Sequence, residues 1–163
     1  MQGEQCCWTS RSKQTQKHIT ESAVELEAIH HGLTRTVAEL SREGARIWIL
    51  GQVPEQDGDP NKALLRTYLF GQEEPVGVSL QEHLTRQSAI NQLFLSFAPN
   101  RVTFLDPAQF CFDAIGQSIV YDSEGSCYWD DDHLSTHGAE TLLRELLAPV
   151  FGEIKRTLLD LRD

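Results

Sequence analysis

The chain has 163 residues, of which 40% are hydrophobic and 23% are charged, a composition typical of one soluble globular domain with a sizeable core. A formal net charge of −10 and the lack of any basic run argue against a nucleic-acid-binding surface, because phosphate binding needs clustered Lys and Arg. No apolar stretch approaches the about 20 residues that span a bilayer, and the polar residues 1–20 do not form a signal peptide. We therefore expect a soluble chain without an export signal of its own.

The first predicted helix follows residues 1–19, which have no clear periodicity. Ser22 and Glu25 form a capping box, and Gly44 is a typical residue just after a helix C-terminus. Between them, five apolar residues recur at helical spacing: Leu26, Ile29, Leu33, Val37 and Leu40. The apolar run at residues 47–50 then predicts a strand that is buried on both faces, with Trp48 in the core.

Residues 55–78 are rich in Gly, Pro and acids, and this composition predicts a long surface excursion with a short helix near residues 63–70. A second capping box, Ser79 with Glu82, opens a predicted helix that Pro99 ends. The run at residues 102–105 predicts a second strand, which Asp106 and Pro107 end.

Residues 108–127 are predicted to form a loop and a small hairpin, with residues 119–121 as one arm and residues 122–125 as its turn. The last predicted helix runs from about residue 136 to residue 161, and Pro149 is expected to kink it or to split it in two. Its buried face is predicted to comprise Leu142, Leu143, Leu146, Val150, Ile154 and Leu158.

The order helix–strand–helix–strand–helix predicts an α/β fold, with helices layered on a parallel sheet, in a single domain over residues 1–163. Two strands are too few for a free-standing parallel sheet, because they leave unpaired edges. We therefore expect the chain to be the C-terminal part of a larger α/β domain that is incomplete at its N-terminus.

The four cysteines, Cys6, Cys7, Cys111 and Cys127, lack metal-ligand spacing in the sequence. Two states stay open for the last two: buried free thiols, which are the more common case, or a Cys111–Cys127 disulfide in an oxidising compartment. Asp57-Gly58-Asp59 lacks the later ligands of a calcium loop, so a turn is expected there. No metal or cofactor is predicted.

The stretch from Tyr128 to Ala139 carries the strongest chemical signal. It places Asp130 three residues before His133 and is followed by a helix-start signal at Ser135 or Thr136. A carboxylate that fixes the tautomer of an imidazole base is two-thirds of a Ser-His-Asp triad. Taken by itself, an Asp-x-x-His pair is more often a solvated helix cap, and the cluster Asp130–His133 could instead bind a divalent metal.

The block Tyr-Trp-Asp-Asp-Asp-His-Leu-Ser-x-x-Gly-Ala resembles the Asp-x-x-His block of SGNH hydrolases, especially SGNH domains fused to acyltransferase-3 membrane proteins. Gln52-Val53-Pro54 and Phe104-Leu105-Asp106-Pro107 with Cys111 resemble two further segments of that family. The resemblance implies a flavodoxin-like α/β/α fold, with Asp130 as the triad acid and His133 as the general base. It also implies that Gly138 lets the first helical turn pack closely.

The family resemblance further implies a serine esterase or O-acyltransferase domain that acts on the acyl groups of cell-surface polysaccharides. The expected partners are an acylated or acyl-accepting carbohydrate and a membrane acyltransferase domain upstream in the parent protein. That parent would lie at the bacterial inner membrane, with this domain on the periplasmic or extracytoplasmic side.

The nucleophile of the family is missing from the sequence. There is no Gly-Asp-Ser block and no Gly-x-Asn, so neither the serine nor most of the oxyanion hole can be assigned. We therefore expect the chain alone to have no esterase activity. The alternatives are a non-catalytic binding module on a hydrolase scaffold and a truncated inactive fragment.

Overall fold

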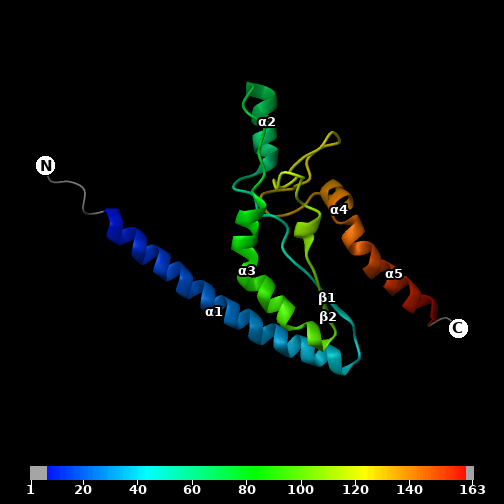
Figure 1. Ribbon diagram of the computed structural model, residues 1–163. Coiled ribbons are helices and arrows are strands. Elements are labelled where there is room, and N and C mark those ends of the chain that lie inside the picture. The colour runs from blue at the N-terminus through cyan, green and yellow to red at the C-terminus, as the bar shows by residue number, and fades with distance from the viewer. Residues whose placement is uncertain (1–6, 161–163) are drawn as a thin grey trace. The chain divides into compact units, whose positions relative to one another are not determined.

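The computed structural model describes residues 7–160, with the side chains of residues 24–157 and 159 except that of Asn100 (Figure 1). The described residues form a mixed α/β structure with a parallel sheet, which confirms the predicted fold class. Its elements are α1 (Cys7–Arg42), β1 (Ile47–Leu50), α2 (Pro60–Phe70), α3 (Leu80–Ser96), η1 (Ala98–Asn100), β2 (Val102–Leu105), η2 (Pro107–Gln109), α4 (Thr136–Leu142) and α5 (Arg144–Asp160). None of the described helices combines the length and the hydrophobicity needed to cross a membrane.

The chain divides into two compact units. Within the described part of the chain, the first comprises residues 7–47 and 92–103, and the second comprises residues 48–91 and 104–160. In the first unit, α1 packs on η1, and the ring of His30 lies 5.8 Å from that of Phe97 between centroids. Val37, Phe97 and Val102 are the buried apolar residues described there.

Helix α1 begins at Cys7, so Ser22 lies inside the helix and the predicted start at the Ser22–Glu25 capping box is wrong. A capping box is a local pattern, and here the chain continues the helix on both sides of it. The predicted end is confirmed. Gly44 has φ of 77°, and the N–H of Ala45 donates to the carbonyl of Leu40, as in a Schellman motif.

The two strands pair in parallel, through Ile47 N–H to the Arg101 carbonyl at 3.2 Å and Gly51 N–H to the Leu105 carbonyl at 2.9 Å. Both lie at the predicted positions, but β1 is not buried on both faces. Ile47, Trp48 and Ile49 are half-buried and Leu50 is exposed. The expectation that Trp48 is a core residue is therefore wrong, since a two-stranded sheet offers less cover than the multi-stranded sheet that the apolar run suggested.

The predicted excursion at residues 55–78 contains α2, which starts before the expected residue 63. Asp59 sets the start, because its carboxylate accepts the backbone N–H groups of Asn61 and Lys62. The capping box of α3 is confirmed: Glu82 accepts the N–H of Ser79 at 3.0 Å, and the Ser79 hydroxyl accepts the N–H of Glu82 at 3.3 Å.

The predicted hairpin is present, with a bridge between Tyr121 and Ser126. The predicted C-terminal helix is split, but at Leu143 rather than at Pro149, which lies inside α5. Because Pro149 lies in the second turn of α5, its missing N–H removes a single helical hydrogen bond. Ile154, expected to be buried, is 43% exposed, and the side chain of Leu158 lies outside the described residues.

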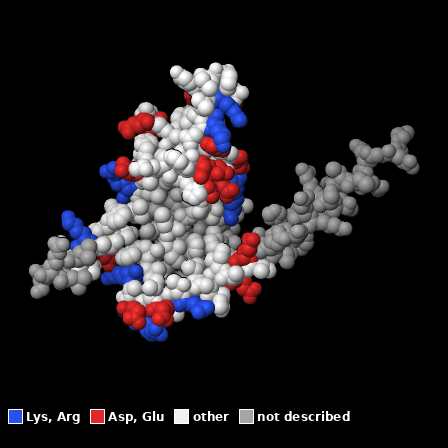
Figure 2. All heavy atoms as spheres, turned by 180° about the vertical axis from the view of Figure 1, so that it is seen from behind, with Lys and Arg blue, Asp and Glu red and all other residues white. Residues whose placement is uncertain are grey.

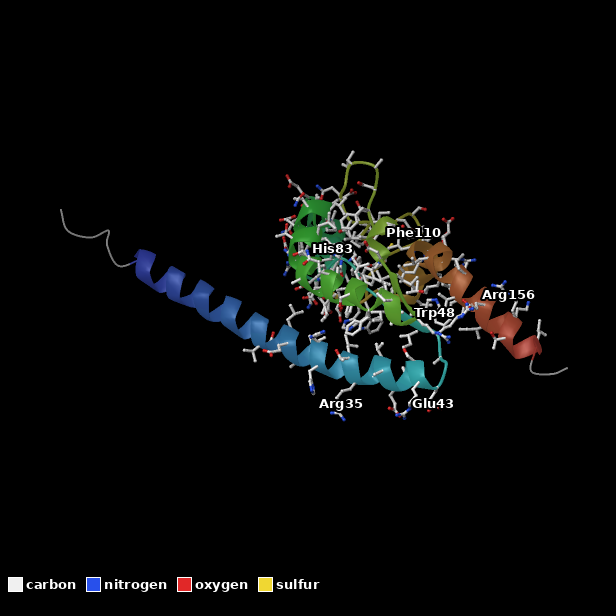
Figure 3. The ribbon with its side chains drawn as sticks, turned by 60° about the horizontal axis from the view of Figure 1, so that its bottom comes forward. Arg35, Glu43, Trp48, His83, Phe110 and Arg156 are labelled. Atoms are coloured by element: carbon white, nitrogen blue, oxygen red, sulfur yellow. The ribbon has the colours of Figure 1, made fainter. Side chains whose placement is uncertain are left out.

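The core of the second unit lies between the hairpin and α4. It comprises Cys111, Val120, Cys127, Tyr128, Leu142 and Leu143. His83 on α3, which Figure 3 labels, is also buried. Its ring lies 5.6 Å from that of Phe112 between centroids. The face shown in Figure 2 carries acidic and basic side chains intermixed, without a continuous basic area.

The start of α4 touches the backbone of the hairpin at Gly138. A Cβ at this position would lie 1.9 Å from the carbonyl oxygen of Cys127, which is a backbone atom and is not free to move aside. This contact fulfils the expectation that Gly138 allows close packing of the first turn.

We expect Gly138→Ala to destabilise the protein by about 3 kcal/mol, because the added methyl group overlaps the Cys127 carbonyl. The matched control is Gly152→Ala in α5, where nothing lies within 4 Å of the added Cβ. This variant should gain up to about 1 kcal/mol from the better helix propensity of Ala. Urea unfolding of the three proteins tests this, and equal midpoints for Gly138→Ala and the wild type would contradict the prediction.

Candidate functional site

The candidate site is the loop between the hairpin and α4 that carries Asp130 and His133. The Tyr128–Leu134 bridge closes this loop, and the N–H of Trp129 donates to the His133 carbonyl at 2.8 Å. Beyond the bridge, Ser135 caps α4 by accepting the N–H of Gly138 at 3.0 Å. Of the two predicted caps, Ser135 and Thr136, the structure thus uses Ser135.

The structure brings the two predicted catalytic residues into direct contact. The Nδ1 atom of His133 lies 3.0 Å from Oδ1 and 3.1 Å from Oδ2 of Asp130. The same Oδ1 accepts the backbone N–H groups of Asp132 at 3.1 Å and of His133 at 2.8 Å. Asp130 therefore fixes both the loop backbone and the orientation of the imidazole ring.

The other ring nitrogen of His133 faces solvent. The side chain is 70% exposed, and Nε2 has no hydrogen-bond partner within the described part of the chain. With Nδ1 held by a carboxylate, the neutral ring carries its proton on Nδ1 and leaves Nε2 as a base. This is the state in which a histidine removes a proton from a hydroxyl group.

A second carboxylate also contacts the imidazole ring, and this contact was not among the predicted ones. Asp132 Oδ1 lies 2.8 Å from His133 Nδ1. Asp130, Asp132 and His133 thus bring three metal-ligand atoms together, whereas Asp131 is not part of this group. The single Nδ1 atom of His133 is therefore shared between the carboxylates of Asp130 and Asp132.

The electrostatics of the pair favour the charged forms of both residues. The hydrogen bond to Asp130, with the charges of Asp130 and Asp132 nearby, raises the pKa of His133 above its ordinary 6.5. For Asp130, desolvation alone would raise the pKa. The hydrogen bonds from the N–H groups of Asp132 and His133 and from the His133 ring outweigh it, so the pKa of Asp130 is lowered.

Three residues from the segment after β1 hold the loop in place, two through their side-chain amides and one through its backbone N–H, and none was predicted as a site residue. Asn61 on α2 donates to the carbonyls of Tyr128 at 3.0 Å and Trp129 at 2.9 Å. The side-chain amide of Gln52 donates to the Asp132 carbonyl at 3.2 Å. The backbone N–H of Gln56 donates to the Asp131 carbonyl at 2.7 Å. For Gln52 the sequence offered two signals, its family-like Gln52-Val53-Pro54 segment and its position just after a strand, where sites of α/β proteins tend to lie. No such signal marked Asn61, which lies on α2.

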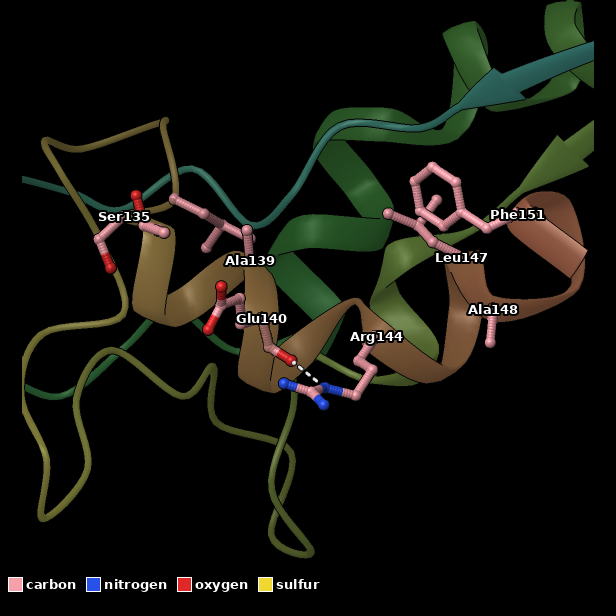
Figure 4. A pocket seen from close by; sticks show the side chains of 9 residues that line it. Ser135, Ala139, Glu140, Arg144, Leu147, Ala148 and Phe151 are labelled. Carbon is pink, nitrogen blue, oxygen red and sulfur yellow. Dashed lines mark hydrogen bonds between the residues drawn. The ribbon is translucent and has the colours of Figure 1, made fainter. Parts of the chain in front are cut away.

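A groove of about 600 Å³ begins at the residue after His133. It is mostly apolar and follows α4 and α5, where Leu147 and Phe151 lie side by side (Figure 4). Arg144, which donates to the Glu140 carbonyl at 3.2 Å, and Glu140 itself provide its charged groups. No serine hydroxyl among the described side chains is hydrogen bonded to His133 Nε2.

We expect His133 to titrate above pH 6.5 in the folded protein, and Asp130→Asn to lower this value because the carboxylate that stabilises the imidazolium is removed. A histidine with a raised pKa stabilises the fold fully below the unfolded value of 6.5, and this stabilisation is lost as the pH rises through the folded value. NMR titration of the His133 ring protons in the wild type and in Asp130→Asn tests the expected pKa values.

The expected pH dependence of stability is tested by the free energy of unfolding of the wild type and of His133→Gln at pH 5.5 and pH 9. A stability difference between the two proteins that grows with pH would contradict the prediction.

A comparison with protein families identifies the chain. A family model described as "SGNH domain (fused to AT3 domains)" matches residues 6–148, which include the whole candidate site. No curated protein and no solved structure matches the chain. The match confirms the resemblance inferred from residues 128–139 and supports a hydrolase- or acyltransferase-like domain. The chain belongs to the family of SGNH domains that are fused to acyltransferase-3 (AT3) domains.

Proposed function

We propose that Asp130 and His133 are the acid and the general base of an SGNH-type serine esterase or O-acyltransferase. The observation that carries this proposal is the geometry of the ring: Nδ1 is held by Asp130, and Nε2 is open to solvent. A general base needs one ring nitrogen that a hydroxyl group can reach, and the exposed Nε2 meets this requirement. The family match supports the same role.

In the proposed reaction, His133 Nε2 removes the proton from a serine hydroxyl as the oxygen attacks the carbonyl carbon of an acyl ester. Asp130 stabilises the imidazolium that forms and keeps the ring in place. The imidazolium then protonates the leaving alkoxide, and an acyl-serine remains. Water or a sugar hydroxyl, deprotonated by the same Nε2, resolves the acyl-serine and frees the serine.

The serine belongs to a polypeptide segment outside these 163 residues, since they contain no Gly-Asp-Ser sequence. The same segment would supply the Gly and Asn of the oxyanion hole. Because the members of a triad act as a unit, the acid and the base alone contribute little.

The proposed substrate is an acylated or acyl-accepting polysaccharide of the bacterial cell envelope, handled outside the cytoplasm by a parent protein with a membrane acyltransferase domain. The family's fusion to AT3 domains supports this assignment. Trp129, which is 77% exposed and adjoins Asp130, offers a flat apolar surface for a sugar ring. The groove that starts at Leu134 provides further apolar contact beside His133.

A block exchange tests the catalytic role. Residues 126–139 of this chain replace the corresponding block of an active SGNH domain of the same family, and hydrolysis of p-nitrophenyl acetate is measured. We expect the exchanged enzyme to be active, His133→Ala to lower kcat by at least about 1,000-fold, and Asp130→Asn by at least about 100-fold. The matched control is Asp131→Asn, which makes the same change in charge next to Asp130 but removes no described contact to His133.

Equal loss in Asp130→Asn and Asp131→Asn would show that net charge, not the Asp130–His133 contact, matters. The unmodified 163-residue chain is assayed beside its own His133→Ala variant. We expect both to be inactive, and turnover that disappears in His133→Ala would contradict the assignment of the serine to another segment.

A further inference from the structure

A second Asp–His pair lies next to a buried thiol, away from the proposed triad residues. His137 Nε2 lies 2.9 Å from Oδ1 and 2.8 Å from Oδ2 of Asp122. One ligand atom each from Asp122, Cys127 and His137 all lie within 4.8 Å of one another. No pattern of residues marks this group, because the three residues have no spacing typical of a metal site.

Each of the three residues is held by its own backbone contacts. Asp122 closes the hairpin turn, where its Oδ1 accepts the N–H groups of Glu124 at 2.8 Å and Gly125 at 3.1 Å. The carbonyl of Cys127 accepts the N–H of Ser135 at 2.9 Å, just before α4. His137 lies in the first turn of α4, which Gly138 brings against Cys127.

We propose that Asp122, Cys127 and His137 bind a zinc-class divalent cation. Thiolate, imidazole and carboxylate are the three ligand types of protein-bound Zn²⁺, with bonds of about 2.3, 2.0 and 2.1 Å, respectively. Three protein ligands leave the fourth tetrahedral position to water. The thiolate and the carboxylate carry two negative charges, which balance the charge of the ion.

The burial of the three side chains suits such a site. Cys127 is fully buried, whereas His137 and Asp122 have exposed fractions of 27% and 32%, so an ion can reach the group from the His and Asp side. Ligand atoms around a tetrahedral zinc lie about 3.3 Å apart, so the Asp122–His137 contact would open by about half an ångström. The hydrogen bonds from Glu124 and Gly125 to Asp122 would orient the ligating carboxylate, as outer contacts do in known zinc sites.

Binding would change the state of the thiol. Burial raises the pKa of Cys127 to about 11, so the free thiol is protonated at neutral pH. A coordinated thiol is deprotonated, so each ion bound would release one proton, and the affinity would increase with pH. The competing interpretation is that the Asp122–His137 pair only holds the hairpin against α4 and binds no metal ion.

The test is a titration of the full chain with Co²⁺, after chelator treatment and with its thiols reduced. We expect one Co²⁺ per chain, with a sulfur-to-cobalt charge-transfer band, the visible bands of a tetrahedral site, displacement by Zn²⁺ and a higher melting temperature with Zn²⁺. Cys127→Ser should abolish the charge-transfer band and weaken binding by at least about 100-fold, and Asp122→Asn and His137→Gln should weaken it by at least about 10-fold.

Two matched controls keep the assignment specific. Cys111→Ser removes the other buried thiol of the same core, and His133→Gln removes the histidine of the Asp130–Asp132–His133 group, which has no sulfur. Both should keep the charge-transfer band. No thiolate band in the wild type, a band that survives in Cys127→Ser, or one lost in Cys111→Ser would overturn the proposal. If Cys127→Ser fails to fold, undiminished Co²⁺ affinity in both Asp122→Asn and His137→Gln would overturn it equally.

Discussion

The close approach of Gly138 to the carbonyl of Cys127 is the constraint on which the rest of this region depends. It brings the first turn of α4 against the hairpin, and the loop that carries Asp130 and His133 must then close between two fixed ends. The same carbonyl accepts the N–H of Ser135, which caps the helix. One glycine thus fixes the helix start, the loop and the packing of a buried cysteine.

Local chemistry made much of this structure predictable. The Ser79–Glu82 capping box, the end of α1 at Gly44 and both short strands follow from residues that are neighbours in the sequence. The contact between Asp130 and His133 was predictable for the same reason, since three residues separate them and a family pattern marks them. The part of α1 before Ser22 was not predicted, because its sequence has no clear apolar periodicity that indicates a helix.

Features that join distant segments could not be predicted in this way. Asn61 reaches Tyr128 and Trp129 across more than sixty positions, and no pattern in the sequence marks that pairing. His137 and Asp122 meet only because the hairpin and α4 pack together. Burial was also misjudged at Trp48 and Ile154, since an apolar residue shows only that it can be buried, whereas the neighbouring elements decide whether it is.

The hydrogen bonds to Asp130 Oδ1 have a consequence for the thermodynamics of any reaction at this loop. Two backbone N–H groups and the His133 ring are already in place around one carboxylate before any substrate is present. The loss of conformational entropy in ordering these groups therefore occurs during folding and not on the way to a transition state. Because the ring of His133 is already held in place, its acceptance of a proton would need little reorganisation of the surrounding groups. A small reorganisation energy is the property that lets fixed dipoles act more strongly than bulk water.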